Sequence, residues 1–252
     1  MQEVTFETKC WENDYKLMLK TDHLKRMIKN CNYPFVRSQL IINNVNDRIK
    51  VNNLASRLKN KGIINDVINS TELSNRVLDF FNIEYDSFNG GYWYSIAELC
   101  GIYSCRTKYL LHFSSDSYIP SEYKDVEWIY SAIDVMERNP QYIVANPTWN
   151  YRWEGAEKES FDLIENKFFV SCGFSDQCYL INTEAFRKPV YGYDHPDAEM
   201  YPQYGGNHFE RRVFCFMKMN NKLRLTAKDI TYVSKNITHK QYIYEKYRLS
   251  KI

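Results

Sequence analysis

Short apolar segments alternate along this chain with segments of helical periodicity, and this alternation constrains the fold more than any other feature. Residues 3–8 and 39–43 are typical of strands. Between them, apolar side chains share one face of a predicted helix over 15–30, whose start Asp14 can cap. A second helix follows Asp47 and stops at Gly62. The order strand, helix, strand, helix predicts a doubly wound, mostly parallel, Rossmann-like α/β sheet.

The same alternation continues to the end of the chain. The run YLLHF at 109–113 is short, apolar and bounded by polar residues, as expected of a buried parallel strand. In the helix predicted before it, Trp93 stands at helical spacing with Ile96, so we expect Trp93 in the core. The other predicted elements are helices over 71–82, 122–138, 183–187 and 207–219, and strands at 141–145, 167–172, 178–182, 223–225 and 230–232.

Length and composition favour a single domain that does not bind nucleic acid. The 252 residues carry 33 basic and 31 acidic side chains, with no block of five like charges. Seven cysteines form no CxxC pair and no zinc-like cluster, so we expect reduced, mostly buried thiols. Residues 1–10 lack the features of a secretion signal, and no apolar run approaches a membrane span. A soluble protein is expected, cytoplasmic or peripheral to a membrane.

Polar side chains follow each of three predicted strands. The segments are TKCWEND after the first strand, NNVND after the second and SSDS after the central apolar run. Because doubly wound sheets bind ligands at the carboxyl ends of their strands, these segments predict a common site. A carboxylate there, Asp116, can hold a divalent cation that bridges two phosphates, whereas on its own it is also an ordinary turn residue.

From Val4 to about His239 the chain resembles the GT-A glycosyltransferases, particularly the family-2-like enzymes. Ser114-Ser115-Asp116, within LHFSSDSY and preceded by GGYWYSIAELCGIYSCRTK, is similar to the family's DxD segment. The resemblance implies sugar transfer from a UDP-, GDP- or dTDP-linked donor to a glycan or glycolipid acceptor, with Mn²⁺ or Mg²⁺, in polysaccharide biosynthesis. It also implies a nucleotide-sugar-binding half over 1–120, an acceptor-binding half over 121–240 and a basic tail over 241–252. The implied donor-binding residues are Thr8, Trp11, Asn44, Asn89, Ser114 and Asp116, and the implied metal ligands are Asp116 and His239.

Two positions depart from the family pattern. Ser114 replaces the first acid of the DxD segment, so Asp116 alone offers a carboxylate there. Asn43 and Asn44 stand where the family has acids, so the Asn44 amide is expected to contact the base. Lys235 and Lys240 could neutralise diphosphate from the C-terminal tail, or could simply be solvated.

The loop and helix start at 191–213 resemble the part of the family that carries the general base. An acceptor hydroxyl must lose its proton as it attacks the anomeric carbon, and inverting enzymes supply a base for it. Glu210 is the first candidate and His208 the second, followed by Asp197 and Glu199. Glu210 can equally be an acid favoured by the helix dipole. Acceptor contact is expected from Trp149, Tyr151 and Trp153, which alternate in a polar segment.

Two other functions remain open at the level of sequence. A nucleotidyltransferase would need a glycine-rich loop after its first strand to hold a triphosphate, and TKCWEND has no glycine. A non-catalytic sugar- or nucleotide-binding protein on the same scaffold would explain the absence of acids at 43, 44 and 114.

Overall fold

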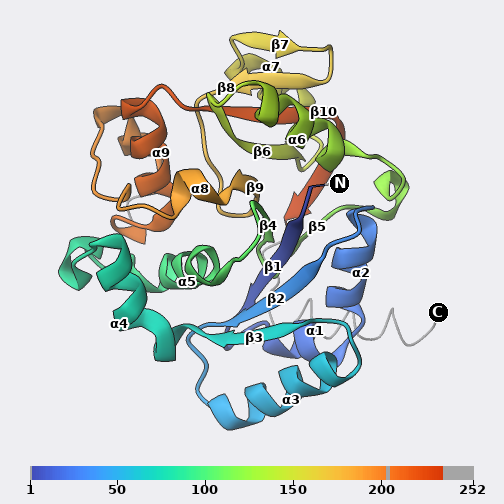
Figure 1. Cartoon of the computed structure of the whole chain (residues 1–252), viewed down its shortest axis with the longest axis vertical. Coiled ribbons are helices and arrows are strands. Elements are labelled where there is room, and N and C mark those ends of the chain that lie inside the picture. Colours follow the sequence, from blue (N-terminus) through green and yellow to red (C-terminus); the bar gives the residue numbers. More distant parts are fainter. Residues whose placement is uncertain (1, 203–204, 235–252) are drawn as a thin grey trace.

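A computed structural model describes residues 2–202 and 205–234 and contains one ten-stranded sheet (Figure 1). The strand order is β3-β2-β1-β4-β9-β6-β10-β8-β7, and β5 pairs with β10. Strands β3, β2, β1 and β4 run parallel, as do β6 and β10, whereas β9 is antiparallel to both β4 and β6. The strands are β1 Val4–Cys10, β2 Arg37–Ile42, β3 Asp66–Asn69, β4 Tyr109–Phe113, β5 Ser117–Tyr118, β6 Tyr142–Trp149, β7 Asp162–Ile164, β8 Phe168–Ser171, β9 Cys178–Asn182 and β10 Leu223–Ser234.

Helices cover both faces of this sheet, which confirms the predicted doubly wound fold. Buried side chains of α1, α2, α3 and α6 form a core on one face, and those of α4, α5, α8 and α9 form a core on the other. Strand residues alternate between the cores: Leu40 joins the first and Ile41 the second. The helices are α1 Tyr15–Lys20, α2 His23–Asn30, α3 Arg48–Asn60, α4 Ser70–Phe81, α5 Ile96–Ser104, α6 Trp128–Arg138, α7 Trp153–Glu159, α8 Thr183–Phe186 and α9 Phe209–Met219.

Several predicted boundaries were wrong. The helix expected over 15–30 is broken into α1 and α2, because Thr21 Oγ1 donates to Leu17 O and accepts from the His23 N–H. The helix expected over 122–138 begins only at Trp128. The two short strands expected near 223–232 form one strand, β10, whose register shifts between Ala227 and Thr231.

Trp93 is the clearest correction in this region. It lies in a 3-10 turn, η2 (Tyr92–Tyr94), ahead of α5, and its side chain is 40% exposed rather than buried in the core. Strands β3 and β7 and helix α7 were not predicted, since each is short and carries no clear apolar periodicity.

The cysteines are mostly buried, as expected. All seven cysteines are free; six are buried and Cys172 is partly exposed. None of the helices within the described ranges is long and apolar enough to cross a bilayer. Strand β9, from the predicted acceptor half, lies between β4 and β6 in the one sheet, and the functional division at residue 120 stays a prediction.

Candidate functional site

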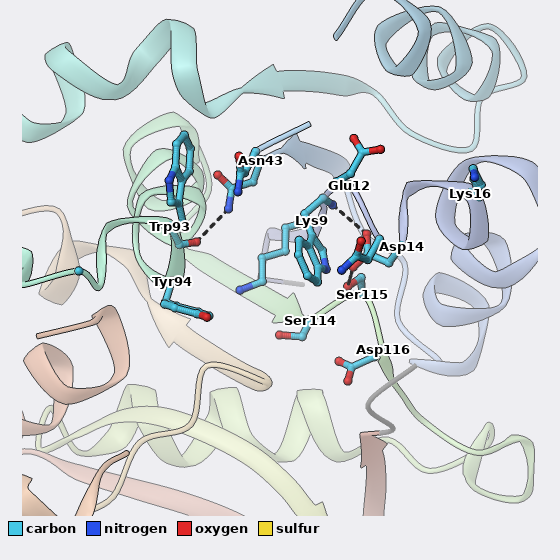
Figure 2. Close-up of a pocket in the computed structure, with 14 residues that line it drawn as sticks. Lys9, Glu12, Asp14, Lys16, Asn43, Trp93, Tyr94, Ser114, Ser115 and Asp116 are labelled. Atoms are coloured by element: carbon cyan, nitrogen blue, oxygen red, sulfur yellow. Dashed lines mark hydrogen bonds between the residues drawn. The ribbon is translucent and has the colours of Figure 1, made fainter. Parts of the chain in front are cut away.

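A pocket of about 810 Å³ opens where β1, β2 and β4 end (Figure 2). The three polar segments that follow these parallel strands meet here, as the sequence predicted. The 3-10 turn η2 and the residues before it close another side. The lining residues are Lys9, Trp11, Glu12, Asn13, Asp14, Lys16, Asn43, Asn44, Gly90, Trp93, Tyr94, Ser114, Ser115 and Asp116.

Backbone and side-chain hydrogen bonds fix the segment after β4. The Ser114 N–H donates to Gln177 O at 2.8 Å, and Ser114 Oγ donates to Asp176 O at 3.2 Å. Ser115 Oγ donates to the carboxylate of Asp14, which also accepts from the Trp11 N–H at 2.8 Å. Asp14 was expected to cap α1, but its side chain makes no capping hydrogen bond and braces the end of β4 instead.

Asp116 offers the pocket a half-buried carboxylate. Burial raises its pKa, and a long hydrogen bond from Ser234 Oγ, at 3.3 Å, only partly offsets that effect. Such a carboxylate is suited to a cation, because a nearby positive charge would restore the favourable interactions lost to desolvation. The described residues gather no set of three or more His, Cys, Asp or Glu side chains around an ion. Asp116 could hold a divalent cation whose other ligands would come from the bound molecule and from water. His239, Lys235 and Lys240 lie outside the described residues.

The opposite side of the pocket is aromatic and amide-rich. The side chains of Trp11 and Trp93 are 43% and 40% exposed, so their faces are available to a ring. Asn43 is buried, donates to Trp93 O and accepts from Ser70 Oγ, so its amide holds η2 in place. Asn44 is exposed with a left-handed backbone (φ 46°), which leaves its amide to a ligand.

His208 and Glu210 stand together at the start of α9. His208 Nε2 lies 3.5 Å from Glu210 Oε2, and both side chains are largely buried. Burial and the Asp176 carboxylate raise the pKa of Glu210 to about 7, against the opposing effect of His208. Burial lowers the pKa of His208, but the interaction with Glu210 outweighs it and the pKa is raised overall.

Asp176 connects these two residues to the end of β4. Its carbonyl accepts from Ser114, its N–H donates to the Glu210 carboxylate, and its own carboxylate raises the pKa of both Asp116 and Glu210. The loop that carries Asp176 thus lies between the end of β4 and the start of α9. Sequence reasoning assigned the surrounding segment to the acceptor side but did not single out this residue.

Arg212 joins α9 to the loop beside the pocket. Its buried guanidinium donates to the carbonyls of Asn207, Tyr191 and Ser87, and it lies over the Phe88 ring. The carbonyl of Phe88 also accepts from the Asn207 N–H at 2.8 Å. The start of α9 and the loop that leads to Gly90 are therefore held as one unit.

Several predicted site residues do not line the pocket, His208 and Glu210 among them. Thr8 is fully buried in β1, and Asn89 is exposed at the end of η1 (Tyr85–Phe88) without lining the cavity. Asp197 and Glu199 are exposed on η4 (Pro196–Met200). The expected acceptor-contacting aromatic residues do not line it either: Trp149 is partly buried at the end of β6, Tyr151 is exposed, and Trp153 is partly buried at the start of α7.

Lys9 was missed at the level of sequence. It projects from the end of β1 into the pocket, where its ammonium pairs with Glu98 of α5. A lysine inside an apolar strand pattern was the only available signal, and it did not reveal a partner 89 positions away.

Comparisons with known proteins identify the fold. Neither protein-family models nor curated protein sequences match this chain. Among solved structures, GalNAc-T7 with UDP, GalNAc and Mn²⁺ matches at TM-score 0.58 and 10% identity, over 93% of this chain and 44% of that one. S. aureus TarS 1-349 in complex with UDP matches at TM-score 0.51 and 13% identity, over 98% of this chain and 64% of that one. The chain thus spans less than two thirds of either GT-A glycosyltransferase, and the likeness establishes a shared fold.

Proposed function

From the GT-A fold, we propose that this chain is a glycosyltransferase that moves a sugar from a nucleoside diphosphate to an acceptor hydroxyl, with inversion at the anomeric carbon. The observation that carries the proposal is the pocket at the ends of β1, β2 and β4, which combines exposed aromatic faces with the half-buried Asp116 carboxylate. Fold alone does not determine activity, so these side chains carry the proposal.

The donor occupies the pocket with its base toward Asn44, Trp11 and Trp93, and its diphosphate toward Asp116. Stacking on the indole faces supplies base affinity, and the Asn44 amide supplies hydrogen bonds. UDP is the first nucleotide to test because both structural neighbours were solved with it, followed by GDP and dTDP. Mn²⁺ or Mg²⁺, held by Asp116 with His239 as a candidate second ligand, would stabilise the charge that develops on the departing diphosphate.

Glu210 is the proposed general base, and His208 is its rival. As the acceptor oxygen bonds to the anomeric carbon, the bond from that carbon to the diphosphate oxygen breaks, and the hydroxyl proton passes to the base. Burial and Asp176 bring the pKa of Glu210 to about 7, where it can accept a proton at neutral pH. An acceptor of the glycan or glycolipid type, in polysaccharide biosynthesis, is part of this proposal.

The test combines binding and turnover. Thermal shift against UDP-, GDP- and dTDP-sugars, with and without Mn²⁺, identifies the donor, and release of the nucleoside diphosphate measures transfer or donor hydrolysis. Asp116→Ala should abolish turnover while circular dichroism shows an unchanged fold. Wild-type activity in this variant would remove the proposed role of the pocket. Metal-dependent binding without any turnover, across a broad acceptor panel, would instead favour a non-catalytic binding protein.

A further inference from the structure

One face of β1 is polar although it lies inside the protein. Glu7 and Lys9 both point toward α5, where Glu98 and Gly101 stand one turn apart and face them. A Cβ added at Gly101 would collide with the Glu7 carboxyl, so the glycine makes room for it. Glu7 and Lys9 of β1 thus face Gly101 and Glu98 of α5, and together they form a buried polar seam between the strand and the helix.

The inner part of this seam carries little charge. Burial raises the pKa of Glu7 well above its usual value and lowers that of His112, so both tend toward their neutral forms. Glu7 pairs with His112 Nδ1 at 2.8 Å and accepts from the Gln39 amide, and Tyr179 stacks on the His112 ring at 4.7 Å. These contacts give the Glu7 carboxyl hydrogen-bonding partners without a fixed charge, whereas His112 Nε2 and the Tyr179 hydroxyl have no hydrogen-bond partner among the described residues.

Lys9, at the outer end of the seam, is different. Burial opposes its charge, but Glu98 and then Asp176 outweigh that effect, and the pKa of Lys9 is raised. Its side chain is 18% exposed, whereas Glu98 is fully buried. Glu98 Oε2 has no hydrogen-bond partner among the described residues, and the ion pair of this carboxylate is with Lys9 through Oε1. The pair thus presents an ammonium to the pocket and keeps its counter-charge buried between α5 and β1.

We propose that Lys9 is a protein-borne cation that binds the diphosphate of the donor, and that Glu98 positions it. This inference rests on the function proposed above. Figure 2 shows the Lys9 side chain extended among the residues of the pocket, with its ammonium toward the space between Tyr94 and Ser114. Ser114 is neutral, so β4 places no carboxylate in the pocket before Asp116. A fixed ammonium opposite Asp116 gives the phosphates a second positive partner besides any metal ion.

If the Lys9–Glu98 ion pair were purely structural, its joint replacement would leave diphosphate binding unchanged. Because two charges removed from water gain little over well-packed apolar groups, such a pair can be replaced on both sides without loss of function. Removal of Lys9 alone would leave Glu98 buried and unpaired and would endanger folding, so both sides must be changed together. Lys9→Met/Glu98→Gln removes both charges at nearly constant volume and is the main test variant. Glu98→Gln alone keeps the ammonium and a hydrogen-bond acceptor for it.

The experiment is isothermal titration of UDP, GDP and dTDP and of their nucleosides, with Mn²⁺ and separately in chelator. Wild type should prefer the diphosphate over the nucleoside in both media. In Lys9→Met/Glu98→Gln the diphosphate should bind roughly 10–100-fold more weakly while nucleoside affinity is unchanged, the expected value of one charge-assisted phosphate contact. Glu98→Gln should retain the preference. Lys20→Met, an equal loss of charge at an exposed site of α1 outside the pocket, should behave as wild type.

The possible failures are distinguishable. If wild type binds none of these diphosphates even with Mn²⁺, the proposed function and this inference both fall. If wild type prefers the diphosphate only with metal, or if the folded double variant keeps the preference in chelator, the role of Lys9 is overturned and sugar transfer stands.

Discussion

His208 Nε2 lies 3.5 Å from Glu210 Oε2 across the first turn of α9. This contact joins the two residues that compete for the role of general base, and the Asp176 carboxylate raises the pKa of both. A proton taken by either residue therefore changes the other, so the pair titrates as a unit.

Transfer should depend on pH through this unit. A base must be unprotonated, so kcat/KM should rise with pH through about 7, the pKa of Glu210, and level off above it. Glu210→Gln should lower kcat by roughly 100- to 10,000-fold, the usual contribution of a general base. A pH profile of both enzymes measures this. Near-normal turnover in Glu210→Gln, with a large loss in His208→Gln, would assign the base to His208.

The same carboxyl should make stability fall with rising pH. Its pKa is 4.5 ordinarily and about 7 in the folded state, so between these values the folded protein binds more protons than the unfolded chain. Stability from this group is present below about pH 4.5 and is lost as pH rises to 7. Glu210→Gln should lack this loss and be more stable by roughly 1–3 kcal/mol at pH 8, with little difference at pH 4.5.

Urea unfolding at the two pH values measures the effect. Glu199→Gln, which removes an exposed carboxylate on η4, is the matched control and should show no pH-dependent gain. An equal gain in the control, or none in Glu210→Gln, would contradict the raised pKa.

Activity should be lost on chelation and restored by Mn²⁺ or Mg²⁺. Asp116→Asn keeps the shape of the side chain but removes the charge that holds the ion, and we expect a loss of about 100-fold or more in kcat, since metal stabilisation of the leaving group is worth several kcal/mol. Added metal should not restore this variant. Full activity of wild type in chelator would contradict the metal requirement. Protein groups would then have to stabilise the charge on the departing diphosphate.

Trp93 should contribute to base binding rather than to stability. Its indole is 40% exposed and lines the pocket, so Trp93→Ala should leave the urea midpoint unchanged. Loss of one base-stacking contact should weaken nucleoside binding by about 1–3 kcal/mol. Phe161→Ala, at a 66% exposed ring that does not line the pocket, controls for loss of surface aromatic area. Unchanged uridine, guanosine and thymidine affinities would exclude this position for the base.

The central part of the fold could be predicted from the sequence. The run at 109–113 became the fully buried β4, and Asp47 caps α3 through a hydrogen bond from the Lys50 N–H, because these signals are local. The meeting of the three strand ends was also predictable, since parallel strands end at one edge of a sheet.

The partners of the site residues were not predictable in this way. The pairs Lys9–Glu98 and Ser115–Asp14 join positions 89 and 101 residues apart, and only the packed fold brings them together. Trp93 misled because its spacing suits a helix, whereas the chain at 92–94 turns outward before α5 begins. Asp176 lies in a Ser/Asp segment of ordinary composition, so the sequence did not mark it. Its role depends on its contacts with Ser114 at the end of β4 and with Glu210 of α9.

Gly206 should be essential to the packing of the start of α9 against the loop that leads to Gly90. Its backbone is left-handed (φ 57°), and an added Cβ would meet the carbonyls of Phe88 and Asn89, the former at 2.6 Å. Gly206→Ala therefore combines backbone strain with a clash against main-chain atoms that Arg212 holds through Ser87. We expect a loss of roughly 2–4 kcal/mol in stability, as the sum of these two effects, together with reduced turnover.

Gly192→Ala is the matched control, because that glycine has open space around its Cβ position and no left-handed backbone. Urea unfolding and the turnover assay should separate the two variants: Gly192→Ala close to wild type, Gly206→Ala impaired in both. If Gly206→Ala kept full stability but lost activity, the loop would be able to move away from α9 at little cost. The Arg212 contacts would then not fix the distance between the general base and the donor pocket, and α9 and the loop would not form a rigid unit.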